Sequence, residues 1–579
     1  MTMLTKWGAA LDRSCPLPEY PRPQLRRESF YNLNGVWDYA ITASGDEPEV
    51  WDGEIVVPFS PEAPLSGAAR GPAKDEFLHY RRSFTLPDGF RKDRVLLHFG
   101  AVDQIAEVFV NGVSAVKHSG GYWPFSADIT SLLREGENVL CVTVRDNADD
   151  PTFAYGKQRY KRGGMWYTAQ SGIWQTVWLE SVPEVHIVSL RITPEFDDAR
   201  VRIELETAGE SRAAITCDVL GEDGSFVAGS WAKGGVCVVP LPGFHAWTPD
   251  DPYLYALDIT CGEDHVESYF AMRKFSYVEH NGHKVFGLNN VPLFHNGLLD
   301  QGYYPDGLLT PPSDEAMVHD IETMKRCGFN MLRKHIKIEP LRWYYHCDRL
   351  GMIVWQDMVS GGQPYSFLHV SALPTLGVVD LPDRDAKPYG RSGMLSRARF
   401  RREMADTVRH LYNCPCIALW TVFNEGWGQF DALEMANELK MLDATRFIDH
   451  ASGWQDQGRE EMKSRHIYFC PVKLKNDGRA LALTEYGGYV LAVDGHRWTD
   501  KVFGYRICRD AAALTRDYEK LMLGQVLPHI RAEGLTAAVY TQITDVEEEL
   551  NGLMSYDREV LKIPEETLRE INAALHFDA

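Results

Sequence analysis

The sequence predicts an all-β N-terminal half followed by an α/β barrel. Before residue 277, short alternating apolar runs are separated by turn signals about every ten residues, which is typical of β-sheet domains. After residue 277, strand-like and helix-like segments alternate over about 300 residues, which indicates a parallel sheet with helical crossovers. The length of 579 residues suits three domains when one of them is a barrel.

The first two domains are predicted at residues 1–182 and 183–276. Val, Ile, Phe, Tyr and Thr dominate the runs of the first domain, and Asn111-Gly112 has the composition of a hairpin turn. The boundary to the second domain lies at Val182-Pro183. The length of this domain suits a small sandwich of immunoglobulin-like size, although it lacks a Cys–Trp–Cys pattern. The runs of the first domain lie at 79–86, 93–102, 105–112, 138–146 and 175–181.

The third domain is predicted at residues 277–579 as a (β/α)8 TIM barrel. Ser313 is the expected N-cap of its first helix, Gly328 the expected end of that helix, and Gly351 the end of the second. No glycine-rich phosphate-binding motif follows the first strand, so a barrel is favoured over a nucleotide-binding sheet. Strands are expected at 329–335, 352–358, 416–425, 446–452, 465–470, 480–487 and 536–544, and helices at 314–327, 339–350, 396–412, 432–444 and 564–575.

Composition excludes several classes of partner. The formal net charge of −21 argues against a nucleic-acid partner, and no run approaches the ~18 apolar residues of a membrane span. The eleven cysteines include no CxxC pair, so neither a metal nor a cofactor is expected. Lys6, Asp12 and Arg13 interrupt any apolar core of a signal peptide, which favours a cytoplasmic protein and leaves a processed secreted form as the alternative. The sequence leaves open whether the protein forms a homo-oligomer.

Functional groups of a barrel gather at the C-terminal ends of its strands. There, Glu425 and Glu485 each end an apolar strand, and a buried glutamate is costly unless it is paired or used. As an alternative, each could cap the following helix or pair with Arg333 or His335. Two carboxylates that face each other across a polar pocket are what acetal hydrolysis needs. Aromatic residues, 11% of the chain, fit either a sugar site or β-domain cores.

Segments of all three domains resemble glycoside hydrolase family 2, which contains β-galactosidases, β-glucuronidases and β-mannosidases. The N-terminal segments YRRSFTLP, EVFVNG, ADITSLLREGENVLCVTVRDN and SGIWQTVWLE resemble that family's sugar-binding jelly roll. The segment WTVFNEGWG resembles its Asn-Glu pair at the fourth barrel strand, and LTEYGG its nucleophile segment at the seventh. The resemblance implies a jelly-roll β-sandwich, an immunoglobulin-like sandwich and a catalytic barrel, acting on a carbohydrate without a cofactor.

The resemblance also implies roles for individual residues. Glu425 would be the general acid/base and Glu485 the nucleophile of a retaining mechanism, with carboxyls about 5–5.5 Å apart. Apolar neighbours such as Trp420 or Trp427 would keep Glu425 protonated, and Tyr468, Tyr486 or Arg333 would donate to Glu485. Arg333 has an alternative role in a barrel-floor ion pair with Asp357. The expected substrate-binding residues are Asn424, Arg333, His335, Asp357, Tyr468, Tyr486, Asp300, Trp427, Gln542 and Asn551.

The identity of the sugar depends on a motif near the C-terminus. Glucuronidases of the family carry Asn-x-Lys before a glycine, whereas this chain has Asn551-Gly552-Leu553 beside three acids at 547–549. The missing lysine and the neighbouring acids disfavour a uronate and favour a neutral sugar. The main prediction is therefore a β-galactosidase-type exo-glycosidase. The alternative is that the acids are only a solvated helix end, in which case their charge says little about the sugar. The long segment 358–395 could supply a cation from Arg384, Lys387 or Arg391.

Three alternatives therefore stay open at this point. A β-glucuronidase or another uronidase is the runner-up, and an α-L-arabinosidase is a further enzymatic alternative. The non-enzymatic alternative is a carbohydrate-binding protein with an inactive barrel.

Overall fold

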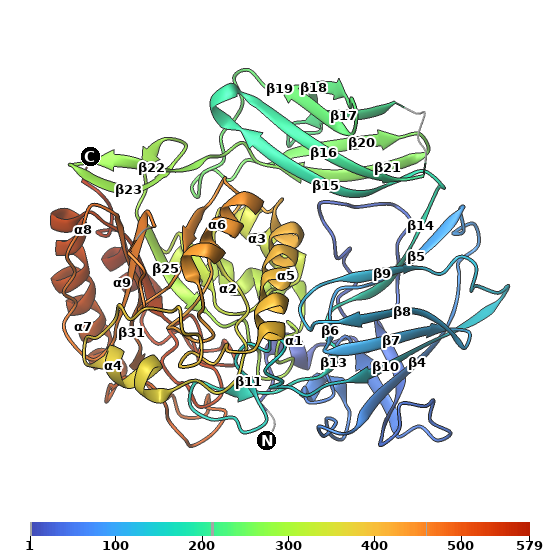
Figure 1. Ribbon diagram of the computed structural model, residues 1–579, viewed down its shortest axis with the longest axis horizontal. Coiled ribbons are helices and arrows are strands. Elements are labelled where there is room, and N and C mark those ends of the chain that lie inside the picture. Colours follow the sequence, from blue (N-terminus) through green and yellow to red (C-terminus); the bar gives the residue numbers. More distant parts are fainter. Residues whose placement is uncertain (1–2, 210–213, 459, 579) are drawn as a thin grey trace.

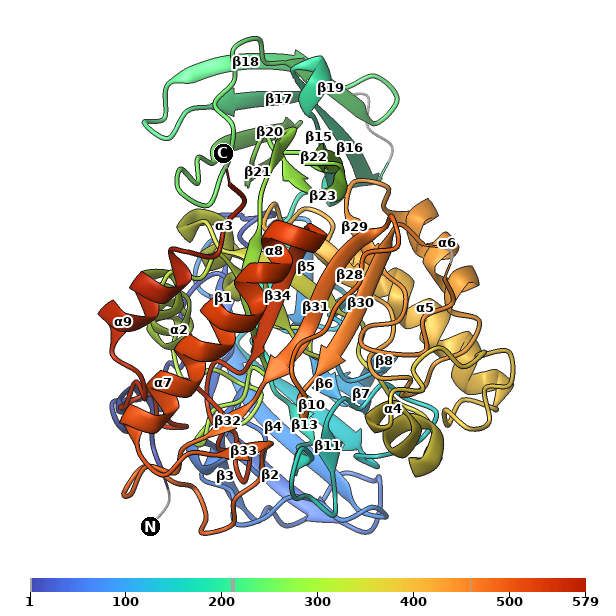
Figure 2. The ribbon, with the colours of Figure 1, turned by 90° about the vertical axis from the view of Figure 1, so that its left-hand side faces the viewer.

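The computed structural model describes residues 3–209, 214–458 and 460–578. Two β-sandwiches flank an α/β barrel, one beside it and one across the end where the barrel strands begin (Figure 1). The first sandwich, blue to teal, also reaches under the opposite end of the barrel, where the strands finish (Figures 1 and 2). The predicted order of two β domains and a barrel is confirmed.

The first domain is a jelly roll of two antiparallel sheets. Its strands alternate buried and more exposed residues, as in β10, where Leu140, Val142 and Val144 face the core between the sheets. One sheet has the order β1 (Tyr31–Asn32), β14 (Val177–Val182), β5 (Arg94–Phe99), β9 (Phe125–Asp128). The other has the order β3 (Gly53–Val57), β2 (Gly35–Thr42), β4 (Phe77–Thr85), β10 (Glu137–Arg145), β7 (Ile105–Val110), β8 (Val113–Ser119).

The second domain is a sandwich of a three-stranded and a four-stranded sheet. Its core contains the free thiols of Cys217 and Cys237 rather than a disulfide. One sheet has the order β15 (His186–Glu195), β16 (Arg200–Ala208), β19 (Val236–Pro240). The other has the order β18 (Phe226–Trp231), β17 (Ile215–Leu220), β20 (Tyr255–Cys261), β21 (Asp264–Phe270).

Eight parallel strands form the barrel (Figure 2). Each strand pairs with the next through backbone hydrogen bonds, from β29 at one edge of the eight-stranded sheet to β30 at the other edge. Among the described residues, the two edge strands β29 and β30 share no backbone ladder with each other. The hydroxyl of Ser464 on β30 donates to Asp449 on β29 at 3.0 Å and joins the two edges. The order is β29 (Phe447–Asp449), β28 (Ile417–Thr421), β27 (Ile353–Asp357), β26 (Met331–Lys334), β25 (His295–Asp300), β34 (Leu535–Thr541), β31 (Ala480–Gly487), β30 (Met462–Ile467).

Helices cover the outside of the barrel, and most of them are where the sequence predicts them. Ser313 caps the first by accepting from the N–H of Ala316 at 3.2 Å, and Gly328 and Gly351 end the first two with φ of 88° and 72°. The described residues between β29 and β30, and between β30 and β31, contain no helix, so two of the expected βα units are incomplete. The helices are α2 (Asp314–Arg326), α3 (Leu341–Leu350), α5 (Met394–Leu411), α6 (Ala432–Leu442), α7 (Ala511–Leu521), α8 (Leu527–Glu533) and α9 (Glu565–Asn572), of which α7 and α8 were not predicted.

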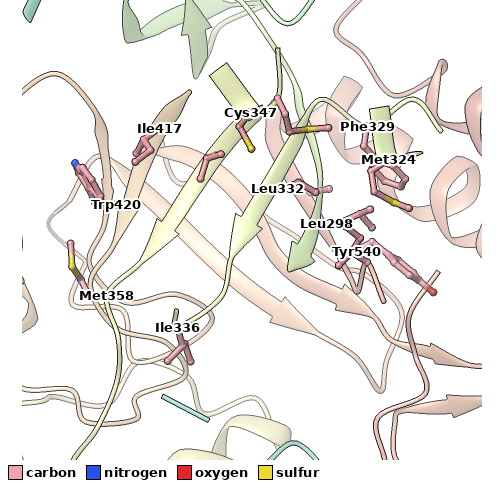
Figure 3. Packing of buried hydrophobic residues seen from close by; sticks show 14 of the residues in the cluster. Leu298, Met324, Phe329, Leu332, Ile336, Cys347, Met358, Ile417, Trp420 and Tyr540 are labelled. Carbon is pink, nitrogen blue, oxygen red and sulfur yellow. The ribbon is translucent and has the colours of Figure 1, made fainter. Parts of the chain in front are cut away.

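Two apolar layers hold the barrel together. Outward side chains such as Leu298 and Leu332 pack with Met324 and Phe329 of the helical layer (Figure 3). The barrel interior forms a separate cluster, and many of its members are small, which leaves room for a plug. That plug is the sheet of β22 (Phe275–His280), β23 (His283–Leu288) and β24 (Val291–Pro292), so the predicted boundary at 276/277 falls inside β22.

We expect Phe286→Ala to destabilise the barrel by about 3–5 kcal/mol, because it removes a buried ring from the plug and leaves a cavity. Phe286 is fully buried and stacks on Phe447 with ring centroids 4.2 Å apart. Urea unfolding followed by tryptophan fluorescence measures the loss. Val291→Ala is the control in the same sheet, because Val291 is 63% exposed; equal losses for the two variants would show that the plug does not stabilise the barrel.

Candidate active site

A β-bulge in β31 turns one of the predicted carboxylates into the barrel. Ala480 and Ala482 face the interior, whereas Leu483 packs outward. Strict alternation would therefore turn Glu485 outward. The register of β31 shifts between Leu483 and Tyr486, and this extra residue lets Glu485 face inward.

Glu425 and Glu485 face each other with a histidine between them. One carboxylate oxygen of each and a ring nitrogen of His466, on β30, all lie within 4.8 Å of one another. Nδ1 of His466 is 3.0 Å from Oε1 of Glu425 and 3.5 Å from Oε2 of Glu485. Burial lowers the pKa of His466 to about 4, so its ring is neutral at pH 7. The ring can therefore donate one hydrogen bond to this pair without adding a charge.

The backbone at Glu425 is held in an unusual conformation. Its φ is 55°, in the left-handed region that costs a residue other than glycine about 1–3 kcal/mol. The N–H of Glu425 donates to the carbonyl of Ser452 at 2.9 Å, and its carbonyl accepts from Nε1 of Trp454 at 2.8 Å. These two hydrogen bonds hold the carboxylate at the end of β28 over the cavity.

The environment of Glu425 favours the protonated form. Burial raises its pKa to about 7, although the ammonium of Lys157 and the guanidinium of Arg333 oppose the shift. Among the described residues, neither cation forms an ion pair with Glu425 within 4.0 Å. A carboxyl with this pKa holds its proton up to neutral pH and can donate it to a substrate.

Glu485 has stronger donors than Glu425. The hydroxyl of Tyr468 donates to Oε2 at 2.5 Å, and Nη1 of Arg333 donates to Oε1 at 3.1 Å. Burial raises the pKa of Glu485, and the charge of Arg333 and the hydrogen bond from Tyr468 oppose it. When the two facing carboxyls share one proton, these direct donors favour the ionised form at Glu485 and leave the proton on Glu425.

Arg333 is fully buried at the centre of the site and makes both of the contacts that the sequence offered as alternatives. Nε and Nη2 donate to the two oxygens of Asp357 at 3.0 Å each, while Nη1 reaches Glu485. Burial would raise the pKa of Asp357, but Arg333 and the hydrogen bond from His335 lower it to about 2. Asp357 therefore stays ionised and orients both Arg333 and His335, whose Nδ1 lies at 2.8 Å.

Two amide side chains offer unused hydrogen-bonding atoms to the cavity. Asn424 accepts from Nη2 of Arg333 at 2.8 Å, and no described residue accepts from its Nδ2. Gln301, only 2% exposed, lines the cavity, and neither of its amide atoms has a hydrogen-bond partner among the described residues. Buried amides are rarely unpaired, so both are candidates to hydrogen-bond a ligand in this cavity.

A segment of the jelly roll forms one wall of the cavity. Residues 154–168 leave the first domain and run along the barrel, where the N–H of Tyr155 donates to the carbonyl of Ser360 at 3.2 Å. Lys157 and Trp166 of this segment line the cavity. Among the described residues, Nζ of Lys157 has no hydrogen bond or ion pair, and its one aromatic contact is with a ring 5.7 Å away. The cavity therefore contains an uncommitted cation that lies far from the glutamates in the sequence.

The three acids at 547–549 hold this wall against the barrel. They are not a solvated helix end, because Glu547 and Glu549 are 2% and 3% exposed and belong to no helix. Each accepts a hydrogen bond from the jelly-roll segment: Glu547 from the N–H of Thr168 at 2.9 Å, Glu548 from the N–H of Gly164 at 3.0 Å, and Glu549 from the hydroxyl of Tyr167 at 2.5 Å.

Aromatic side chains narrow the cavity. Trp427 and Tyr365 line it, and Tyr505 stacks on Tyr468 with ring centroids 3.7 Å apart. Tyr365 belongs to the predicted wall segment 358–395. The free volume of about 40 Å³ is well below the ~300–1,000 Å³ of most ligand pockets.

The basic residues of segment 358–395 do not reach this cavity. Arg384 and Lys387 are exposed, and Arg391 donates to the carbonyl of Gly361 at 2.7 Å beneath α5. The cation that the sequence analysis sought in this segment is supplied instead by Lys157 of the jelly roll.

A larger cavity, of about 810 Å³, lies where the three domains meet. Trp123 and Trp178 of the jelly roll and Arg399 and His410 of α5 are among its lining residues. Neither Glu425 nor Glu485 lines it, so the larger cavity is not the one that contains the facing carboxyls.

Three predicted residues face away from the cavity because of strand alternation. Asp300 precedes the inward-facing Gln301. The carboxylate of Asp300 lies outside the barrel, where it accepts a hydrogen bond from Nζ of Lys334 at 2.7 Å. The hydroxyl of Tyr486 contacts Met522 at 3.1 Å, so it cannot donate to Glu485. Trp420 lies in the outer core (Figure 3). Trp427 is the tryptophan that lines the cavity with Glu425.

Two further predicted residues, Gln542 and Asn551, lie behind the cavity wall. Nε2 of Gln542 donates to Oδ1 of Asn551 at 2.8 Å, and Nδ2 of Asn551 donates to Glu549 at 3.1 Å. Glu549 lines the cavity, so these amides act through it as positioning residues.

The cavity also contains five residues that were not predicted from the sequence: His466, Gln301, Lys157, Glu549 and Tyr505. Strand alternation could have found His466, because it lies two residues before Tyr468 on the same face of its strand. Nothing local marks Lys157, because only the packing of two domains brings it to the barrel.

Two groups of described residues have side-chain atoms close enough to bind a metal ion. One is the group of Glu425, His466 and Glu485 in the candidate site, whose atoms are already engaged in the hydrogen bonds above. The other, His496 with Asp557 and Glu559, lies at the surface near the C-terminus.

Family comparisons agree with this architecture. The model for "Glycosyl hydrolases family 2, sugar binding domain" matches residues 65–183, "Glycosyl hydrolases family 2" matches 185–273, and "Glycosyl hydrolases family 2, TIM barrel domain" matches 312–472. The chain belongs to glycoside hydrolase family 2. Glu425 lies inside the matched part of the barrel, and Glu485 lies beyond it.

Curated relatives include enzymes for two kinds of sugar. A β-galactosidase of Thermoanaerobacter pseudethanolicus is 25% identical over 63% of this chain and 47% of its own length. A β-glucuronidase of Felis catus is 24% identical over 70% of this chain and 65% of its own length. The chain thus spans less than two thirds of these relatives.

Solved structures share the fold at low identity. A β-glucuronidase of Bifidobacterium dentium, complexed with coumarin-3-O-glucuronide, has a TM-score of 0.75 at 18% identity, covering 95% of this chain and 98% of its own. A family 2 β-galacturonidase of Eisenbergiella tayi has a TM-score of 0.71 at 18% identity, covering 97% of this chain and 99% of its own.

Within residues 3–209, 214–458 and 460–578, no helix has the length and apolar character needed to cross a membrane.

We expect Arg333→Met to destabilise the protein by about 3–5 kcal/mol, because it leaves Asp357 and Glu485 as buried charges without their cation. Urea unfolding measures the loss. Arg402→Met is the matched control, because Arg402 is 76% exposed and pairs only with Asp406 at 3.5 Å; its effect should stay within about 0.5 kcal/mol. Equal effects would contradict a central role for Arg333.

Proposed function

We propose that the protein is a retaining, exo-acting β-glycosidase that hydrolyses terminal sugars. The observation that carries the proposal is the pair of facing carboxyls, Glu425 and Glu485, with oxygens within 4.8 Å. This separation suits a nucleophile and an acid/base, about 5–5.5 Å apart, because an inverting pair needs about 6.5–9.5 Å to accommodate a water. A cavity walled on several sides suits a chain end, which supports exo action.

The electrostatics assign the two roles. Glu425, with a pKa raised to about 7, protonates the glycosidic oxygen while Glu485 attacks the anomeric carbon and forms a glycosyl–enzyme ester. Glu425, now ionised, then takes a proton from water, which attacks the same carbon and releases the sugar and Glu485. Nδ2 of Asn424 is available to donate to the sugar's 2-hydroxyl, and Tyr468 and Arg333 hold Glu485 in place.

A second candidate, a uronide-specific enzyme, gains support from Lys157. The neutral-sugar prediction rests on the missing lysine at Leu553 and on repulsion by the acids at 547–549. Two of these acids are engaged by backbone N–H groups of the jelly roll, and Lys157 supplies an unpaired ammonium beside Glu425. Glu549 still places a carboxylate in the cavity, which supports the neutral sugar.

Replacing each glutamate separately should identify its role. We expect Glu425→Gln to lower kcat/KM by about 10²–10⁴-fold on substrates with poor leaving groups, because it removes general acid catalysis. Azide should restore turnover and yield a β-glycosyl azide from this variant, whereas Glu485→Gln should yield an α-glycosyl azide. NMR of the products distinguishes the two; the opposite stereochemistry would exchange the roles, and full activity of Glu485→Gln would refute the proposal.

The pH profile should follow Glu425. Because a pKa of about 7 governs loss of its proton, kcat/KM should fall as the pH rises above about 7. Lys157→Met removes a cation that lowers this pKa, so the basic limb should move to higher pH. Lys501→Met, whose side chain is 76% exposed, is the control and should leave the limb unchanged. A limb that moves to lower pH in Lys157→Met would contradict the assignment.

A panel of aryl β-glycosides separates the two sugar classes. If the substrate is a uronide, Lys157→Met should raise KM for the β-glucuronide or β-galacturonide by about 10- to 100-fold, because it removes a charge-assisted hydrogen bond. If the substrate is a neutral sugar, the β-galactoside should be preferred and its KM should change little. Preference for a neutral glycoside in the unmodified enzyme would exclude the uronide candidate.

A further inference from the structure

Two loops at the surface of the barrel domain bring a histidine and two carboxylates together. His496 lies in the long loop between β32 (Tyr489–Val490) and β33 (Arg506–Ile507), and Asp557 and Glu559 lie in a turn between β34 and α9. Nδ1 of His496 is 2.8 Å from Oδ2 of Asp557 and 3.7 Å from Oε2 of Glu559. One ligand atom of each residue lies within 4.8 Å of the other two.

Backbone hydrogen bonds fix the turn that carries the two acids. The N–H of Ser555 donates to the carbonyl of Val560 at 2.9 Å, and the N–H of Arg558 donates to the carbonyl of Ser555 at 3.0 Å. Arg558, between the two acids, has a φ of 65°, and its guanidinium pairs with Asp320 at 3.2 Å. The cation nearest to the acids in the sequence is therefore committed to another carboxylate.

His496 is the one basic side chain beside these acids in the part of the chain that the structure describes. No Lys or Arg forms an ion pair within 4.0 Å with Asp557 or with Glu559 in those residues. Two carboxylates that converge on one imidazole repel each other, and a bound cation would relieve that repulsion.

The surrounding hydrogen bonds leave one ligand atom of each residue available. Oδ1 of Asp557 accepts from the hydroxyl of Ser555 at 2.6 Å and from the N–H of Glu559 at 3.2 Å, which orients Oδ2 toward the histidine. No described residue donates a hydrogen bond to the carboxylate of Glu559 or contacts Nε2 of His496 through one. Nε2 can therefore carry the ring proton when Nδ1 binds a metal.

We propose that His496, Asp557 and Glu559 form a Zn²⁺ site, with Nδ1, Oδ2 and Oε2 as ligands and water in the remaining position. Zn²⁺ accepts a mixed set of imidazole and carboxylates, whereas Mg²⁺ and Ca²⁺ prefer oxygen ligands alone. Tetrahedral Zn²⁺ with bonds of about 2.0–2.1 Å holds its ligands about 3.3 Å apart. The observed separations of 2.8 and 3.7 Å lie on either side of this value, so small side-chain movements complete the site.

The proposed Zn²⁺ site would anchor a loop that forms part of the cavity wall. The loop that contains His496 ends at Tyr505, which lines the cavity and stacks on Tyr468. The backbone of Phe503 is already fixed at that end, because its N–H donates to the carbonyl of Glu548 at 2.7 Å. Zn²⁺ would fix the other part of the loop. The proposal does not depend on glycosidase activity, and its test measures binding and stability.

The full-length protein, stripped of metal with a chelator, is titrated with ZnCl₂ and, separately, with MgCl₂ and CaCl₂. By calorimetry we expect about one Zn²⁺ per chain that depends on His496, and weaker binding of Mg²⁺ and Ca²⁺. Saturating Zn²⁺ should raise Tm by about 2–5 °C, because it binds the folded state alone.

Two variants remove one ligand each. His496→Gln removes the nitrogen ligand, Glu559→Gln removes a negative charge, and each should weaken Zn²⁺ binding by at least about 10-fold. Glu559→Gln also keeps the test decisive if His496→Gln does not fold, because the side chain of Glu559 is 56% exposed. His265→Gln, at an exposed position of the second domain, is the matched control and should bind Zn²⁺ as the unmodified protein does.

Glu485→Gln separates this site from the other group of candidate ligands, in the cavity. It should keep the Zn²⁺ that His496→Gln loses, and the reverse result would overturn the proposal. An unmodified protein that binds no Zn²⁺ would also overturn it, as would His496→Gln and Glu559→Gln variants that bind Zn²⁺ as tightly as the control. Tighter binding of Mg²⁺ or Ca²⁺ than of Zn²⁺ would overturn the choice of metal.

Discussion

The buried guanidinium of Arg333 is the interaction on which the rest of the site depends. It lies on β26, pairs with Asp357 on β27, and donates to Asn424 after β28 and to Glu485 on β31. One side chain thus joins four barrel strands at the end where the chemistry is expected. Because a buried charge is costly unless all its donors are satisfied, this geometry leaves little freedom to Asn424 and Glu485.

Docking of the jelly roll completes the site. The barrel supplies both glutamates, but segment 154–168 of the first domain supplies Lys157 and Trp166. The acids at 547–549 hold this segment through backbone and side-chain hydrogen bonds. The same acids that suggest repulsion of an anionic sugar when the sequence is considered alone are thus partly structural, and this changes the argument about the substrate.

Most of the fold was predictable from the sequence, whereas the direction of individual side chains was not. Periodicity and capping residues such as Ser313 and Gly351 located the strands and helices, because these signals are local. Asp300 was predicted in place of its inward-facing neighbour Gln301, and Tyr486 was predicted to donate to Glu485 although its side chain faces outward, because inward direction depends on register. The bulge in β31 adds one residue and so reverses which side chains face the barrel interior. The segment LALTEYG contains no proline or unusual residue that would indicate a bulge.

By itself, the sequence determined the order of the domains, the strand ends and the two candidate glutamates, because each is marked by residues adjacent in the chain. Tertiary structure decided which side chains meet. Lys157 and Glu425, which line the same cavity, are 268 positions apart in the chain. Strand register and domain packing bring such groups together, and neither leaves a periodic trace in the chain.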